Sequence, residues 1–275
     1  MNQTIQPSDY DVLIKKIRRK RKIIIALTII AFLVTIVMCS PTKIVLLDKT
    51  VIDYKGTNPV ITIIIVIFIF FCELIAYAFV LTPLTTSMDV ECDPQKQLVL
   101  NMALNKQKNL THIFAMDYFY MGNFETALAL ANKTVASKKL SFVRIGLFNK
   151  ARCEFFLGDF DSLKLTVKQY EAELSNKKVN QKAQVVYQKI QKTMNLLIAI
   201  ADKDKEKICA YRNIEAWNNS KATQGYINYL KGIAAYITDD KKEAVYRFMS
   251  VRENCEKTVL SKMAEQYLSN LDDSI

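Results

Sequence analysis

Two apolar blocks stand out near the start of the sequence. The first runs from Ile23 to Cys39 without a charge, and the second runs from Val60 to Leu81 with Glu73 as its only charged residue. An α-helix rises about 1.5 Å per residue, so the second block can cross the roughly 30 Å of a hydrocarbon core and the first lies at the lower limit. The pattern predicts two membrane-spanning helices, over residues 23–39 and 60–82.

Prolines mark the edges of these blocks. All five lie in the first 94 residues: Pro41 follows the first block, Asn58-Pro59 opens the second, and Pro83 is expected to end it. Residues 95–275 contain no proline and are rich in Ala, Leu, Lys, Gln and Tyr, which favours one helix after another. The predicted fold class is all-α, with two transmembrane helices followed by a helical domain over residues 83–275.

A secretory signal is an alternative explanation for the first block. Met38-Cys39-Ser40 would then be a lipoprotein cleavage site. The apolar stretch is longer than the ~7–15 residues typical of signals, no A-x-A-like site follows it, and methionine fits poorly before the cysteine. A retained helix explains the block better.

Basic residues are distributed unevenly around the blocks. Residues 1–22 hold seven, whereas the connector over residues 40–59 holds three. Lysine and arginine are enriched at the cytoplasmic ends of membrane helices, so we expect both termini in the cytoplasm and the connector outside the plasma membrane. The same cluster could also bind anionic headgroups, at about 1 kcal/mol per residue. It consists of Lys15, Lys16, Arg18, Arg19, Lys20, Arg21 and Lys22.

Glu73 is the most costly residue of the predicted anchor. A carboxylate at bilayer depth costs roughly 3 kcal/mol or more unless it is protonated or partnered. In an antiparallel hairpin of the two spans, Thr28 falls at the same depth and its hydroxyl could share a hydrogen bond with Glu73. An oligomer contact, contact with a transport subunit and a proton-linked site are the alternatives.

The helical part contains a repeated turn. Gly122-Asn123-Phe124-Glu125-Thr126-Ala127 and Gly158-Asp159-Phe160-Asp161-Ser162-Leu163 share one pattern thirty-six residues apart, and Asp239-Asp240-Lys241-Lys242-Glu243-Ala244 repeats it weakly. Each turn follows an aromatic-rich helix, so each predicts a helical hairpin. Helices without this signature are expected over residues 180–201, 204–217 and 257–271.

These features resemble the tetratricopeptide repeat family, whose units are about 34 residues of helix-turn-helix. The small-residue pairs at the helix crossings match as Ala115 with Ala127, Ala151 with Leu163 and Gly232 with Ala244, and Phe124 and Phe160 match the turn aromatic. The sequence departs from the family in lacking the proline that ends each unit, and Leu163 replaces a small residue. An unrelated antiparallel helical bundle is the alternative.

The resemblance implies a solenoid whose first helices line a concave groove for a protein or peptide. Aromatic residues and arginine are enriched at such interfaces. Several aromatic residues on the first helices would be core residues instead if the helix faces that carry them point inward, as the apolar faces of helices usually do. The predicted groove residues are His112, Met116, Phe119, Phe148, Arg152, Phe155, Tyr229, Ile233 and Tyr236.

Composition argues against most catalytic chemistry. The chain has one histidine, six glycines and no Cys-x-x-Cys pair, which leaves little for a His-dependent nucleophile, a metal centre or a glycine-rich phosphate loop. We expect no enzyme activity, no cofactor and no metal. Residues 1–22 carry +5 of the net charge of +11 and the larger helical domain is only mildly basic, so nucleic acid is not an expected partner.

The six cysteines are scattered along the chain. Disulfides are not expected in a reducing cytoplasm, and isolated cysteines on helices usually pack as small apolar residues. Cys92 could be exposed between the anchor and the helical domain, where acylation is conceivable.

Taken together, these patterns predict a membrane-anchored scaffold that tethers a protein or peptide partner at the inner membrane face, where confinement raises its effective concentration. The alternative is an accessory or regulatory subunit of a membrane transport or secretion complex, engaged through the spans and Glu73. The Lys-, Asn- and Ile-rich composition is typical of an AT-rich genome and indicates a bacterial source.

Overall fold

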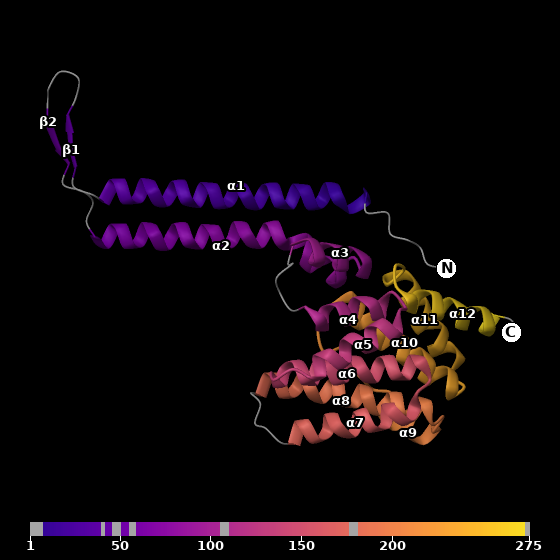
Figure 1. The fold of residues 1–275 in the computed structure, drawn as a ribbon. Helices are drawn as coiled ribbons and strands as arrows, with labels where there is room; N and C mark the ends of the chain where they lie inside the picture. The colour runs from indigo at the N-terminus through magenta and orange to yellow at the C-terminus, as the bar shows by residue number, and fades with distance from the viewer. Residues whose placement is uncertain are drawn as a thin grey trace. The chain divides into compact units, whose positions relative to one another are not determined.

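The computed structural model describes residues 8–39, 42–45, 51–54, 59–104, 110–175 and 181–272. The chain divides into two units, Met1–Leu84 and Thr85–Ile275. The described residues are helical apart from one two-stranded antiparallel sheet (Figure 1), so the all-α prediction is confirmed with that exception. The elements are α1 (Ser8–Cys39), β1 (Thr42–Val45), β2 (Val51–Tyr54), α2 (Pro59–Asp89), α3 (Pro94–Leu104), α4 (Thr111–Tyr120), α5 (Phe124–Val135), α6 (Leu140–Leu157), α7 (Phe160–Ser175), α8 (Gln181–Ala201), α9 (Lys205–Tyr211), α10 (Lys221–Ile237), α11 (Lys241–Asn254) and α12 (Val259–Asp272).

The first unit is a helical hairpin. Helices α1 and α2 run antiparallel to each other (Figure 1), and the strands β1 and β2 pair between them in the register Thr42 to Tyr54 and Val45 to Val51. Helix α1 includes the basic cluster as well as the first apolar block, so the two form one continuous helix. The guanidinium of Arg21 lies 5.2 Å from the centre of the Tyr77 ring and joins the two helices.

Helix α2 contains the stretch that can cross a membrane. Ile61–Leu84 is 24 residues long, apolar, and only 6% buried, unlike the core helix of a soluble protein. It spans roughly 36 Å, which exceeds a hydrocarbon core. Among the described helices α2 alone meets this criterion.

Pro83 does not end the helix, although the apolar stretch Ile61–Leu84 stops one residue after it. Helix α2 continues through Pro83 to Asp89. Proline removes one N–H from the hydrogen-bond ladder, but its fixed φ lies in the helical range, so it can kink a helix without ending it.

The second unit is built from helical hairpins in chain order. The pairs α4–α5, α6–α7, α8–α9 and α10–α11 follow one another, with α3 before them and α12 after them. The first helix of each pair contacts the first helix of the next, from α4 through α6, α8 and α10 to α12. Helices α5, α7 and α11 each also pack against the first helix of the following pair or against α12.

The middle hairpin differs from its prediction in one helix. Helix α8 has nearly the predicted bounds, but α9 ends at Tyr211 rather than extending to Trp217. Beyond it, the Asn218 side chain accepts hydrogen bonds from the backbone N–H and the hydroxyl of Ser220, at 3.0 and 2.8 Å. Such side-chain bonds compete with the helix and favour a turn.

One type of turn joins the two helices in all four hairpins. A residue with positive φ ends the first helix, and the next residue caps the second helix. The capping residue also donates its N–H to a carbonyl five positions back, as Asn123 does to Tyr118 at 2.9 Å and Asp204 to Ala199 at 3.0 Å. This is the Schellman arrangement, followed at once by an Asx cap. The pairs are Gly122-Asn123, Gly158-Asp159, Lys203-Asp204 and Asp239-Asp240.

The first hairpin contacts the last one. The hydroxyl of Tyr120 donates to the carbonyl of Ala222 at 3.0 Å, and an ion pair of 2.8 Å joins Asp93 to Lys257. A Cβ on Gly122 would lie 2.9 Å from Val259, so only glycine allows this close approach. The second unit is thereby closed upon itself, and we call this contact between its two ends the seam.

Candidate functional site

The structure buries five of the nine predicted groove residues. Each is at most 5% exposed, so none can touch a partner in this conformation, and the groove prediction does not hold for them. The physical reason is the closed seam, which brings the aromatic faces of α4, α6 and α10 against one another. The five are Phe119, Phe148, Arg152, Tyr229 and Ile233.

Arg152 lies at the centre of this aromatic core. Its guanidinium carbon is 4.4 Å from the ring centre of Phe119, 4.6 Å from that of Phe148 and 5.2 Å from that of Tyr226. It donates one hydrogen bond to Asn149, while Nε and Nη1 have no hydrogen-bond partner among the described residues. A desolvated cation over aromatic faces gains about 2 kcal/mol or more, which offsets part of the cost of burying it.

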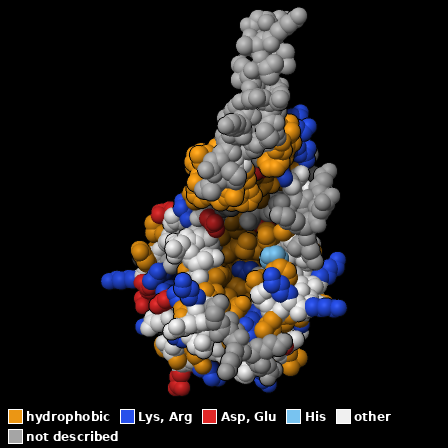
Figure 2. All heavy atoms as spheres, turned by 90° about the vertical axis from the view of Figure 1, so that its left-hand side faces the viewer, with side chains coloured by type: hydrophobic (Ala, Val, Ile, Leu, Met, Phe, Trp, Pro, Cys, Tyr) orange, Lys and Arg blue, Asp and Glu red, His pale blue; other side chains and the backbone are white. Residues whose placement is uncertain are grey.

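The other four predicted residues keep some exposed surface. His112 and Met116 on α4 and Phe155 on α6 are half-buried, and Tyr236 on α10 is 39% exposed. His112 stacks on Phe142 at 4.8 Å, and burial together with the charge of Lys139 lowers its pKa. Figure 2 shows hydrophobic side chains gathered along the middle of one face of this unit, beside areas rich in Lys and Arg.

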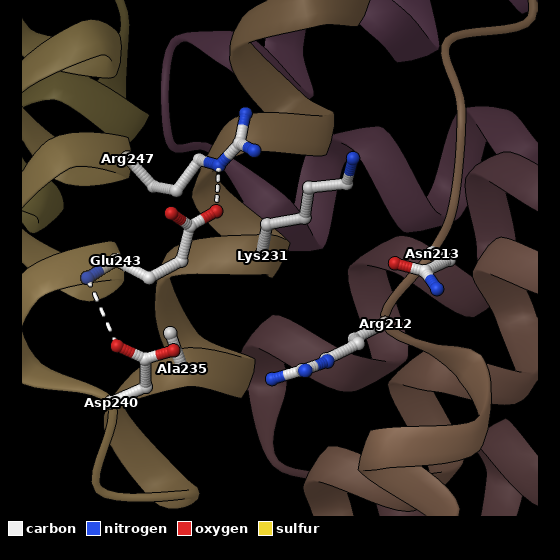
Figure 3. A pocket seen from close by; sticks show the side chains of 7 residues that line it. All are labelled: Arg212, Asn213, Lys231, Ala235, Asp240, Glu243 and Arg247. Atoms are coloured by element: carbon white, nitrogen blue, oxygen red, sulfur yellow. Dashed lines mark hydrogen bonds and ion pairs between the residues drawn. The ribbon is translucent and has the colours of Figure 1, made fainter.

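A polar pocket that the sequence did not predict lies on the second unit. It has a volume of about 180 Å³ and is formed by the residues after α9, by α10 and by the start of α11. In Figure 3, Arg212 and Asn213 lie on one side, Asp240 and Glu243 on the other, and Lys231 between them. The lining residues are Arg212, Asn213, Lys231, Ala235, Asp240, Glu243 and Arg247.

The charges in this pocket are only partly neutralised. Arg247 donates to Glu243 at 2.7 Å and to Asn228 at 2.9 Å, and Asp240 accepts the N–H of Glu243 at 3.2 Å. Lys231 and Arg212 form no ion pair among the described residues, and burial followed by the like charge of Arg247 lowers the pKa of Lys231. An anionic group entering the pocket would add to the attraction that Glu243 and Glu215 already exert on Lys231, and it would meet Arg212, which forms no ion pair among the described residues.

A sequence signal for the pocket exists but is weak. Lys231 interrupts the apolar face of α10, and Glu243 with Arg247 is an ordinary i,i+4 pair. Neither feature indicates that Arg212, nineteen positions before Lys231, would share their pocket. No group of three or more His, Cys, Asp or Glu residues that could hold a metal is present in the described ranges.

Thr28 and Glu73 do not form the hydrogen bond with each other that the sequence allowed. Thr28 and Glu73 do line the same groove between α1 and α2. The hydroxyl of Thr28, however, donates to the carbonyl of Ile24 in its own helix at 3.0 Å. Within the part of the chain that the structure describes, no hydrogen bond or ion pair reaches Glu73.

The basic cluster lies along α1 as one helical segment. Six of its side chains are exposed, and Arg21 is half-buried against Tyr77. Cys92, in contrast to the expectation of an exposed site for acylation, is fully buried in the core of the second unit.

No protein-family model matches the chain, and neither a curated protein nor a solved structure similar to it was found.

Proposed function

We propose that this protein is a membrane-anchored scaffold whose tetratricopeptide-like helical unit binds a protein or peptide partner. The observation that carries the proposal is the fourfold use of one turn geometry, with the first helix of each hairpin stacked on the next. Repeated hairpins of this kind form extended surfaces that suit protein partners. The chain also carries Ile61–Leu84, which is long and apolar enough to anchor it.

The polar pocket supplies the docking point. Neither Arg212 nor Lys231 forms an ion pair among the described residues, although the charges of Glu243 and Glu215 act on Lys231, so the two cations favour a partner that presents a carboxylate. Arginine is enriched among residues that dominate interface energies, and a half-buried lysine gains more from a partner than an exposed one. Tyr236, one residue beyond the pocket-lining Ala235, adds exposed aromatic surface on the same helix.

Photo-crosslinking in intact membranes tests this docking point. A photoreactive amino acid at Asn213 should capture a defined partner, whereas the same group at the exposed Lys168 on α7 should not. Lys231→Met should abolish the Asn213 product while leaving the far-ultraviolet circular dichroism spectrum unchanged. Equal products at both positions, or an Asn213 product that survives Lys231→Met, would refute the assignment.

The proposed topology has two spans and both termini in the cytoplasm. It is supported by the lysine and arginine excess in the first half of α1 and by the exposed apolar side chains of that helix, such as Ile29, Phe32 and Leu33. Cys209 is the exposed thiol of the second unit. A membrane-impermeant maleimide should therefore label Cys209 in inside-out vesicles and not in right-side-out vesicles. Cys209→Ser is the control, and the reverse labelling pattern would overturn the topology.

A second candidate function rests on Glu73. A carboxyl group at that depth with no hydrogen-bond or ion-pair partner among the described residues favours a polar group supplied by another membrane helix, as in an accessory subunit of a transport or secretion complex. Fusing residues 84–275 to an unrelated anchor separates the two functions. Retained function supports the scaffold, and lost function with normal expression supports the subunit.

A further inference from the structure

Two buried thiols meet at the seam. Cys92 lies between α2 and α3, and Cys255 lies between α11 and α12, yet their side chains are hydrogen-bonded to each other. Both are at most 1% exposed. Cys153, the other buried thiol among the described residues, has no such thiol neighbour.

The surrounding contacts hold the two thiols together. Asp93, next to Cys92, pairs with Lys257, two residues after Cys255, at 2.8 Å. A Cβ on Gly225 would lie 2.2 Å from the sulfur of Cys255, so the absence of a side chain there makes room for that sulfur. The two thiols are thus held close together from chain positions 163 residues apart.

The two thiols are not chemically equivalent. The hydrogen bond from Cys92 lowers the pKa of Cys255, and the positive charge of Lys221 acts in the same direction. The same bond and burial raise the pKa of Cys92. The Cys255 thiol itself donates to the carbonyl oxygen of Lys221 at 3.5 Å, and the thiolate is the reactive form of either cysteine.

We propose that Cys92 and Cys255 are a redox site that forms a disulfide across the seam by exchange with a low-molecular-weight disulfide. The Cys255 thiolate attacks one sulfur of that molecule, giving a mixed disulfide and expelling one thiolate, which takes up the Cys255 proton. Cys92 then attacks the Cys255 sulfur, and the second small thiolate leaves with the Cys92 proton. Two protein thiols are oxidised, and one small disulfide is reduced to two thiols.

The disulfide would join the segment before α3 covalently to the segment between α11 and α12. Its formation requires the two sulfur atoms to approach to about 2.05 Å. A bond that closes so long a loop restricts the unfolded chain strongly. In a reducing compartment the seam is held by noncovalent contacts alone, so the state of the thiols sets how easily the aromatic core opens. The disulfide between Cys92 and Cys255 would form whether or not the protein binds a partner.

The test uses the full-length protein, reduced in detergent and then treated with oxidised glutathione. We expect a mass loss of about 2 Da, a linked pair of peptides containing Cys92 and Cys255, and a melting temperature higher by roughly 5–15 °C. Cys92→Ser and Cys255→Ser should each remove all three effects. Cys209→Ser, which changes an exposed thiol, should remove none.

Peptide mapping of the wild-type protein keeps the proposal testable even where a serine variant fails to fold. The proposal is overturned if both thiols stay free under conditions that fully modify Cys209, or if either pairs with another cysteine. It is also overturned if the Cys92–Cys255 bond forms without raising the melting temperature, because a bond across the native seam must stabilise the folded state.

Discussion

Gly232→Ala tests the close helix crossing in the last hairpin. Gly232 lies in the interior of α10, where alanine is intrinsically favoured over glycine by about 1 kcal/mol. A Cβ at this position would lie 2.6, 2.8 and 2.9 Å from three carbons of the Phe248 ring on α11. Ordinary carbon contacts are about 3.5–4.0 Å, so the ring would have to move by roughly 1 Å.

Phe248 is not free to move. Its ring is fully buried, stacked on Tyr267 with centres 4.7 Å apart, and edge-on to Tyr229 at 6.0 Å. Overpacking a site of this kind costs about 1–3 kcal/mol, and rigid neighbours place the cost toward the upper end. After the gain in helix propensity, we expect a net loss of about 1–2 kcal/mol, or roughly 3–6 °C in melting temperature.

The assay is thermal unfolding of the full-length protein in detergent, followed by circular dichroism. Phe248→Leu should also destabilise the protein, but Gly232→Ala with Phe248→Leu should lose less than the sum of the two single losses, because the smaller side chain removes the clash. If Gly232→Ala is as stable as the wild type, or if the two losses simply add, the crossing is not as tight as the structure has it.

Three further predictions follow from individual groups. Burial raises the pKa of Asp117 well above its ordinary value, so the stability that its protonated form contributes is complete below the unfolded pKa near 4 and is lost as pH rises through the folded pKa. Asp117→Asn should therefore stabilise the protein by about 1–3 kcal/mol at pH 7 and be as stable as the wild type near pH 4. Thermal melts at both pH values measure this difference. Asn123→Ala removes the cap that accepts the N–H of Thr126 and should cost about 1 kcal/mol in the same melts, whereas Asn123→Asp should not. Glu73→Gln should insert normally in a membrane-fractionation assay, and lost function despite normal insertion would identify the carboxyl group as functional.

Local patterns in the sequence predicted the hairpins well. The turns at Gly122 and Gly158 depend on residues that follow one another directly, a positive-φ residue and a capping side chain. The turn at Lys203-Asp204 has the same geometry but lacks the sequence signature of these two turns, because lysine rather than glycine occupies the left-handed position. Its distance of thirty-six residues from Asp239 repeats the distance between the two glycines, and that spacing could have revealed it.

The aromatic stripe shows where prediction from sequence stops. Phe119, Phe148 and Tyr229 recur at helical spacing, and this spacing is the same whether the stripe faces a ligand or another helix. The structure brings Phe119 and Phe148 to 5.8 and 6.3 Å from Tyr226, so the stripe is core. The polar pocket was likewise not predictable, since Arg212 and Lys231 belong to different hairpins.

The sequence by itself determined the apolar span, the positions of most helices and the turns that fold them into pairs, because each depends on neighbours along the chain. Only the tertiary structure decided that the last hairpin returns to the first, that Cys92 meets Cys255, and that the expected groove is largely filled by its own side chains. The physical reason is that closure depends on the small rotation between successive hairpins, which accumulates over the whole unit and is not encoded in any single turn.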